Sequence, residues 1–95
     1  MGTTVGLLHL ELYVAQATNL KDKRRVLKSF KDRLANTYNV SVAEVAGQDS
    51  HRRAVLAVAA VGNDKTYLEG SLQRMITAAA NHRDMILVNH EIEWL

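Results

Sequence analysis

Clustered basic side chains are the feature of this sequence with the clearest chemistry. Residues 20–34, LKDKRRVLKSFKDRL, contain seven of the twelve lysine and arginine residues, and Arg52 and Arg53 follow in a second polar stretch. Lysine and arginine bind phosphates through charge-assisted hydrogen bonds and release counterions from a polyanion. The formal net charge is only +2, so a phosphate-binding surface requires the fold to bring these segments together.

The basic segment has the spacing of an amphipathic helix. Its apolar positions form one stripe: Val26, Leu27, Phe30 and Leu34. Asn19 is the expected N-cap, Asp22 favours the positive end of the helix dipole, and the helix is expected to end near Asn36. Lys23 lies at the edge of the stripe. We expect its stem to cover the core while its ammonium group reaches water.

No group of residues has the spacing of an active site. The sequence lacks the glycine loops that bind dinucleotides or triphosphates, and the adjacent Ser50 and His51 have no third group to orient them. His9, Glu11, Asn89 and Glu91 are expected on neighbouring strands, where a hydrogen-bonded or ion-pair cluster is favoured over a metal site. The chain contains no cysteine. The sequence predicts neither an enzyme, a cofactor nor a metal.

The composition is that of one globular domain spanning residues 1–95. Apolar residues make up 47% of the chain and charged residues 23%, which is typical of a folded domain. The first apolar run, residues 5–14, is interrupted by His9 and Glu11 and has no basic leader. It resembles neither a signal peptide nor a membrane span, so we expect a soluble cytoplasmic protein.

Four segments have the alternation or apolar character of strands: residues 5–14, 40–46, 54–61 and 85–94. A second helix is expected to begin after Gly62, Asn63 and Asp64, because apolar residues recur with the 3.6-residue period from Leu68 to Ala79. The order is therefore βαββαβ. Two split βαβ units with right-handed crossovers give an α+β, ferredoxin-like sandwich, with a four-stranded antiparallel sheet and both helices on one face.

This topology predicts that the first helix begins beside the connection between strands 40–46 and 54–61. The candidate nucleic-acid contacts at this end are Lys21, Arg24, Arg25, Lys28, Arg52 and Arg53. Clustered cations near exposed helix N–H groups attract phosphates. The alternative is a solvated helix face that only keeps the protein soluble.

The sheet face that the helices leave uncovered is the second candidate surface. Strand 85–94 is expected to direct Leu87, Asn89, Glu91 and Glu93 toward it. The residues expected to form a dimer face are Leu7, His9, Tyr13, Ala57, Ala59 and Leu87. Base stacking there is not expected, because Tyr13 is a poor platform by itself. An apolar patch of small residues favours packing against a second copy, and the alternatives are a solvated or ligand-covering face.

The motif LKDKRRVLKSFKDRLANTYNVSVAEVAGQD resembles the YlxP-like family of small uncharacterised bacterial proteins, and the similarity covers nearly the whole chain. The resemblance implies a ferredoxin-like fold. Members are often encoded near genes of ribosome maturation and translation initiation, which implies a link to RNA or ribosomes. Family members often have Ser where this chain has Asn19, and both residues cap helices. The family has no established activity, so the resemblance implies no catalytic residue.

Two functional hypotheses follow. The first is a non-catalytic homodimer that docks a structured RNA or a ribosomal particle through phosphates, directed by shape rather than by base sequence. The second is a ligand-sensing or protein-interaction module, whose open sheet face or dimer seam holds a small molecule or a partner. In the second hypothesis the basic helix serves only solubility.

Overall fold

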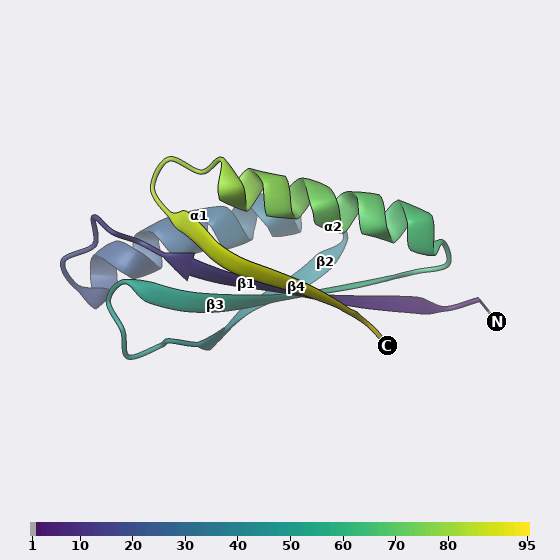
Figure 1. Cartoon of the computed structure of the whole chain (residues 1–95), viewed down its shortest axis with the longest axis horizontal. Helices are drawn as coiled ribbons and strands as arrows, with labels where there is room; N and C mark the ends of the chain where they lie inside the picture. Colours follow the sequence, from purple (N-terminus) through teal and green to yellow (C-terminus); the bar gives the residue numbers. More distant parts are fainter. Residues whose placement is uncertain (1) are drawn as a thin grey trace.

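Four strands and two helices alternate in the order βαββαβ in the computed structural model, which describes residues 2–95. The elements are β1 (Thr4–Tyr13), α1 (Leu20–Thr37), β2 (Val40–Ala46), β3 (Arg53–Gly62), α2 (Lys65–Ala80) and β4 (Ile86–Trp94). The sheet is antiparallel with the strand order β2-β3-β1-β4. Both helices cover the same face (Figure 1). The predicted ferredoxin-like fold is confirmed.

Alternating apolar residues of the central strands form the floor of the core. In β1, Leu8, Leu10 and Leu12 are fully buried, and β3 contributes its own buried row opposite them. The helices supply the other layer, where Leu27, Phe30 and Leu34 of the predicted stripe are buried. Each such side chain contributes about 2 kcal/mol by leaving water. The apolar alternation and the helical stripe therefore meet as the sequence predicted.

Both helices begin at the predicted caps. The Asp22 N–H donates to Oδ1 of Asn19 at 2.9 Å, and the Tyr67 N–H donates to the Asp64 carboxylate at 3.2 Å. These bonds satisfy N–H groups that have no partner within the helix. At its other end, α1 stops where Tyr38 becomes extended.

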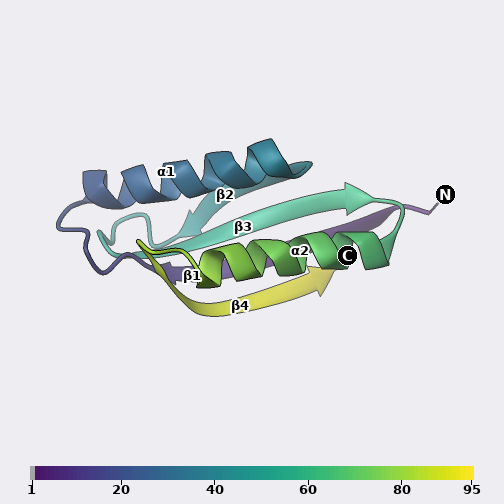
Figure 2. The same ribbon diagram turned by 90° about the horizontal axis from the view of Figure 1, so that it is seen from above.

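The two helices are staggered along the sheet (Figure 2). Helix α1 packs on β2, whereas α2 packs on β1, β3 and β4. Phe30 of α1 meets His82, just after α2, edge to face with ring centroids 5.6 Å apart. The middle of α1 and the segment that follows α2 therefore contact each other in the helix layer.

Each edge strand contains one extra residue. The β1–β4 register shifts between Glu11 and Leu12, which leaves Val88 without a partner, and the β2–β3 register shifts at Val45 in the same way. Such bulges reverse the alternation on one side of the irregularity. Both shifts occur next to the same row of the sheet, because Glu11 and Val55 are opposite each other.

The bulge in β4 corrects one predicted face. Leu87 lies opposite Leu12 and packs against the core, whereas Ile86 lies opposite Tyr13 and is 56% exposed. The prediction that Leu87 belongs to the uncovered face was wrong. From Asn89 onward the side chains alternate between the two faces of the sheet as predicted. The extra residue, Val88, exchanges the faces of the two residues before it.

A buried lysine joins α1 to the β2–β3 hairpin. Nζ of Lys23 donates to Oε2 of Glu44 at 3.0 Å, to the Gly47 carbonyl at 2.8 Å and to the Arg53 carbonyl at 3.1 Å. Its three donors thus have three protein acceptors. Lys23 is fully buried, so the prediction that its ammonium group reaches water was wrong. Only the burial of its aliphatic stem could be predicted from its position at the edge of the apolar stripe.

The hairpin turn presents these acceptors through a glycine. Gly47 has φ +81°, and a Cβ there would lie 2.7 Å from the Arg53 carbonyl oxygen. Only glycine fits this conformation and this close approach without strain. Ser50 Oγ then accepts from the N–H groups of Arg52 and Arg53 at 3.3 and 2.9 Å. The turn is therefore held both by the bonds of Lys23 to the Gly47 and Arg53 carbonyls and by the bonds to Ser50.

Substituting Lys23→Met should lower the free energy of unfolding by about 3 kcal/mol, because the Glu44 carboxylate and two carbonyls would lose their donor. Urea denaturation followed by circular dichroism measures this. Lys21→Met is the matched control on the exposed side of α1 and should change stability by less than about 0.5 kcal/mol. Equal losses in the two variants would contradict the role of Lys23.

Candidate functional site

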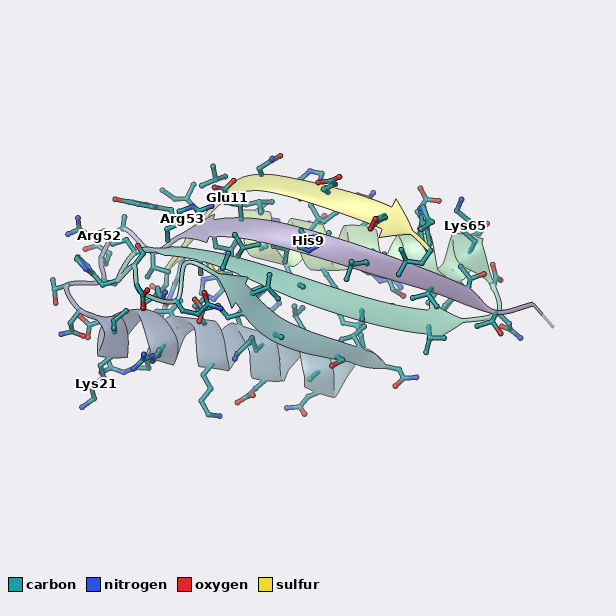
Figure 3. All side chains as sticks on the ribbon, turned by 90° about the horizontal axis from the view of Figure 1, so that it is seen from below. His9, Glu11, Lys21, Arg52, Arg53 and Lys65 are labelled. Atoms are coloured by element: carbon teal, nitrogen blue, oxygen red, sulfur yellow. The ribbon has the colours of Figure 1, made fainter. Side chains whose placement is uncertain are left out.

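The β2–β3 connection lies against the start of α1, as the topology predicted. Nε of Arg52 donates to the Ala17 carbonyl at 3.1 Å, and the Val14 N–H donates to the Arg52 carbonyl at 2.7 Å. Together with the bonds of Lys23, these contacts connect the β1–α1 segment, α1 and the hairpin at one end of the molecule (Figure 3). We call this end, with Lys21, Arg24, Arg25 and Arg52, the basic end.

Three of these cations lie on the first two turns of α1. Lys21, Arg24 and Arg25 are exposed. Within residues 2–95, no carboxylate forms an ion pair with Lys21, Arg24 or Arg52. Arg25 is 72% exposed at its side chain and approaches Asp22 only to 4.0 Å. Their charges are therefore directed to solvent.

Asp22 is held at the start of the same helix. Its Oδ2 accepts from the Thr18 N–H at 3.1 Å and from the Thr18 hydroxyl at 2.8 Å. The backbone hydrogen bond from Thr18, followed by its hydroxyl and the nearby Arg25, lowers the pKa of Asp22 below its ordinary value of 3.8. The carboxylate remains charged and closes the first turn of α1.

Two of the six predicted contacts do not belong to this group. Lys28 is paired with Asp32 at 2.6 Å. Arg53 follows the strand alternation away from the buried Ala54 and pairs with Glu11 at 3.3 Å on the uncovered face (Figure 3). The sequence correctly predicted that the hairpin lies beside the start of α1. It could not show that the side chains of the consecutive Arg52 and Arg53 point to opposite sides of the sheet.

The uncovered face holds five of the six predicted dimer residues. Leu7 lies opposite Ala59 and His9 opposite Ala57, while Tyr13 lies opposite Arg53. No helix crosses this face in the part of the chain that the structure describes (Figures 1 and 3). The sixth, Leu87, is replaced by Ile86 because of the bulge in β4. Ile86 was missed because the sequence carries no local signal for that extra residue.

The polar residues of this face form a shallow cluster. His9 lies opposite Glu91 and Glu11 opposite Asn89, beside a depression of about 180 Å³. Glu11 already pairs with Arg53. Within residues 2–95, no set of three or more histidine and carboxylate side chains is arranged to hold a metal ion.

No helix in the same range is both long and apolar enough to cross a membrane.

The sequence profile of a family described as a protein of unknown function, DUF503, matches residues 5–92. The chain belongs to the DUF503 family. It is 31% identical over 90 residues to the uncharacterized protein YlxP of Bacillus subtilis (strain 168), covering 95% of this chain and 98% of that protein. The resemblance to YlxP-like proteins is thereby confirmed.

Two solved structures are similar to this DUF503 protein. The de novo designed protein Foldit4 has a TM-score of 0.57 with 15% identity, over 98% of this chain and 96% of its own. A dimeric ferredoxin-like protein of unknown function from Thermobifida fusca has a TM-score of 0.47 with 11% identity, over 96% and 90%. The first similarity supports the fold alone, and the second is too remote to support an argument.

Asp22→Asn should destabilise the protein in a pH-dependent manner. The folded pKa of Asp22 is lowered, so its charged carboxylate stabilises the fold above the ordinary value of 3.8, and this contribution is lost as pH falls through the folded pKa. The stability difference between wild type and D22N should therefore be constant from pH 5 to 7 and should shrink below about pH 4. Urea unfolding at successive pH values measures it. A difference that is constant down to pH 3 would contradict the assignment.

Proposed function

We propose that this protein is a non-catalytic cytoplasmic module whose basic end docks a structured RNA or a ribosomal particle through phosphates. The observation that carries the proposal is the attachment of Arg52 to the segment that leads into α1, through its bond to the Ala17 carbonyl. Exposed cations from two separate segments thereby share one end. Lysine and arginine on such a surface contact phosphates without reading bases.

The rigidity beneath the basic end supports this proposal. Lys23 fixes the first turn of α1 to the hairpin through three hydrogen bonds. Lys21, Arg24 and Arg25 therefore project from a backbone that is already in position, and binding orders only their side chains. Preorganisation of this kind reduces the entropy lost on binding. The recognition we propose depends on the spacing of phosphates, and hence on RNA shape.

The number of exposed cations at the basic end sets the expected salt dependence. Four contacts, from Lys21, Arg24, Arg25 and Arg52, would give a slope of log K against log salt of roughly −3 to −4. This is a modest electrostatic contribution. It suits a protein that binds a large particle together with other contacts, or as two copies.

The variant R24A/R25A should weaken binding to a structured RNA and reduce the salt slope by about 2, because two phosphate contacts are removed. Fluorescence anisotropy between about 50 and 200 mM salt measures both quantities. R33A/R74A is the matched control, which removes two exposed guanidinium groups outside the basic end. Equal effects of the two variants, or binding that does not depend on salt, would reject the proposal.

A second copy of the chain is the partner we propose for the uncovered sheet face. Ala57 and Ala59 are small, and they lie beside Leu7 in the middle of a face that no described helix covers. Small side chains allow two sheets to approach closely, and a two-fold interface uses the same patch on both copies. In the alternative function, a ligand-sensing or protein-interaction module, this same face would carry the activity and the basic end would not.

Ala59→Arg should convert the dimer to a monomer, because it places a like charge from each copy in the centre of the interface. Ala59 is exposed, so each copy should keep its fold, which circular dichroism checks. Sedimentation equilibrium measures the mass. Gln73→Arg adds the same charge on the outer surface of α2 and should leave the dimer intact. A wild-type protein that remains monomeric at high micromolar concentration would contradict the dimer.

A further inference from the structure

A cleft of about 390 Å³ opens at the far end of the molecule, where α1 ends and α2 begins. Its walls come from the α1–β2 junction, the end of β3 and the first half of α2. Figure 2 shows why it exists: α1 stops before the sheet does, so β3 and the start of α2 extend beyond it. The basic end and the cleft lie at opposite ends of the chain's long axis, near Lys21 and near Lys65 respectively (Figure 3).

Apolar residues, two tyrosines and several polar residues line the cleft. The floor includes Val40, Ala60, Leu68 and Met75. Tyr38 and Tyr67 provide two phenol rings, and Tyr67 is 67% exposed. Asp64 is the single charged residue among those that line it. A volume near the lower end of the usual range for ligand sites fits a small molecule.

The electrostatics of the cleft favour a positive ligand. The last turn of α1 contains no basic residue, and Thr37 and Tyr38 at this end line the cleft. Carbonyl groups without helix partners give such an end a partial negative charge. The opposing positive end of α2 is occupied by the Asp64 carboxylate, which accepts from the Tyr67 N–H. Lys65 does not supply a cation there, because its Nζ lies 5.1 Å from the Trp94 ring centroid.

We propose that this cleft binds a small organic cation, an ammonium group attached to an apolar or aromatic body. The ammonium group is paired by Asp64 and lies against the phenol rings, where cation–π attraction adds to the charge pairing. The apolar body covers the floor near Leu68 and Met75. An anionic ligand meets no basic side chain among the lining residues. This site is independent of RNA docking and of the dimer.

The test uses three probes that share one apolar body: 2-phenylethylammonium, 2-phenylethanol and 3-phenylpropanoate. Each is titrated into the ¹⁵N-labelled protein and followed by amide chemical shifts. The ammonium probe should bind with saturation, shift the amides of Tyr38, Asp64 and Tyr67, and bind about 10-fold tighter than the alcohol. Stronger binding of the alcohol or the carboxylate, shifts elsewhere, or no saturation at millimolar concentrations would overturn the proposal.

Asp64→Asn separates charge from helix capping, because asparagine caps helices as well as aspartate does. The variant should retain the melting temperature of the wild type but bind the ammonium probe no better than the alcohol. Tyr67→Leu, at an exposed position, should weaken the ammonium probe several-fold and affect the alcohol less. Unchanged preference for the ammonium probe in both variants would show that the cleft is not the site.

Discussion

The ammonium group of Lys23 is the interaction on which the arrangement of this protein depends. A buried charge is costly unless it is fully paired, and here one carboxylate and two backbone carbonyls provide every hydrogen bond that the group needs. The acceptors come from β2, from the turn and from the start of β3. One side chain of α1 therefore sets the position of the hairpin, and with it the position of Arg52. The exposed arginines depend on the buried lysine for their geometry.

Much of the fold could be predicted because it follows from local patterns. The Asn19 cap, the stripe through Leu27, Phe30 and Leu34, and the alternation in β1 are all encoded within a few consecutive residues. The errors concern non-local facts. The burial of Lys23 depends on acceptors more than twenty residues away, and the orientation of Leu87 depends on a bulge that pairing with β1 creates. A single sequence shows neither partner.

The candidate surfaces were predicted to a similar extent. Topology alone was sufficient to predict that the hairpin lies beside the start of α1, because antiparallel strands return to the same end of the sheet. It could not assign Arg53 to the opposite face or pair Lys28 with Asp32, since these outcomes depend on side-chain direction and on individual partners. The far cleft was not predicted either. It results from the difference in position between the two helices, and neither helix reveals that stagger in its own sequence.

The bulges at Val45 and Val88 also determine how this sheet can grow. Both outer strands, β2 and β4, expose backbone groups that could template a neighbouring chain, which is the usual route to fibrils. An unpaired residue in each strand breaks the regular ladder and increases the local twist. A strand from another chain could therefore form a regular hydrogen-bond ladder with only part of β2 or β4. The bulges thus protect the protein against polymerisation through its edge strands, while the uncovered face of the sheet remains accessible to a partner.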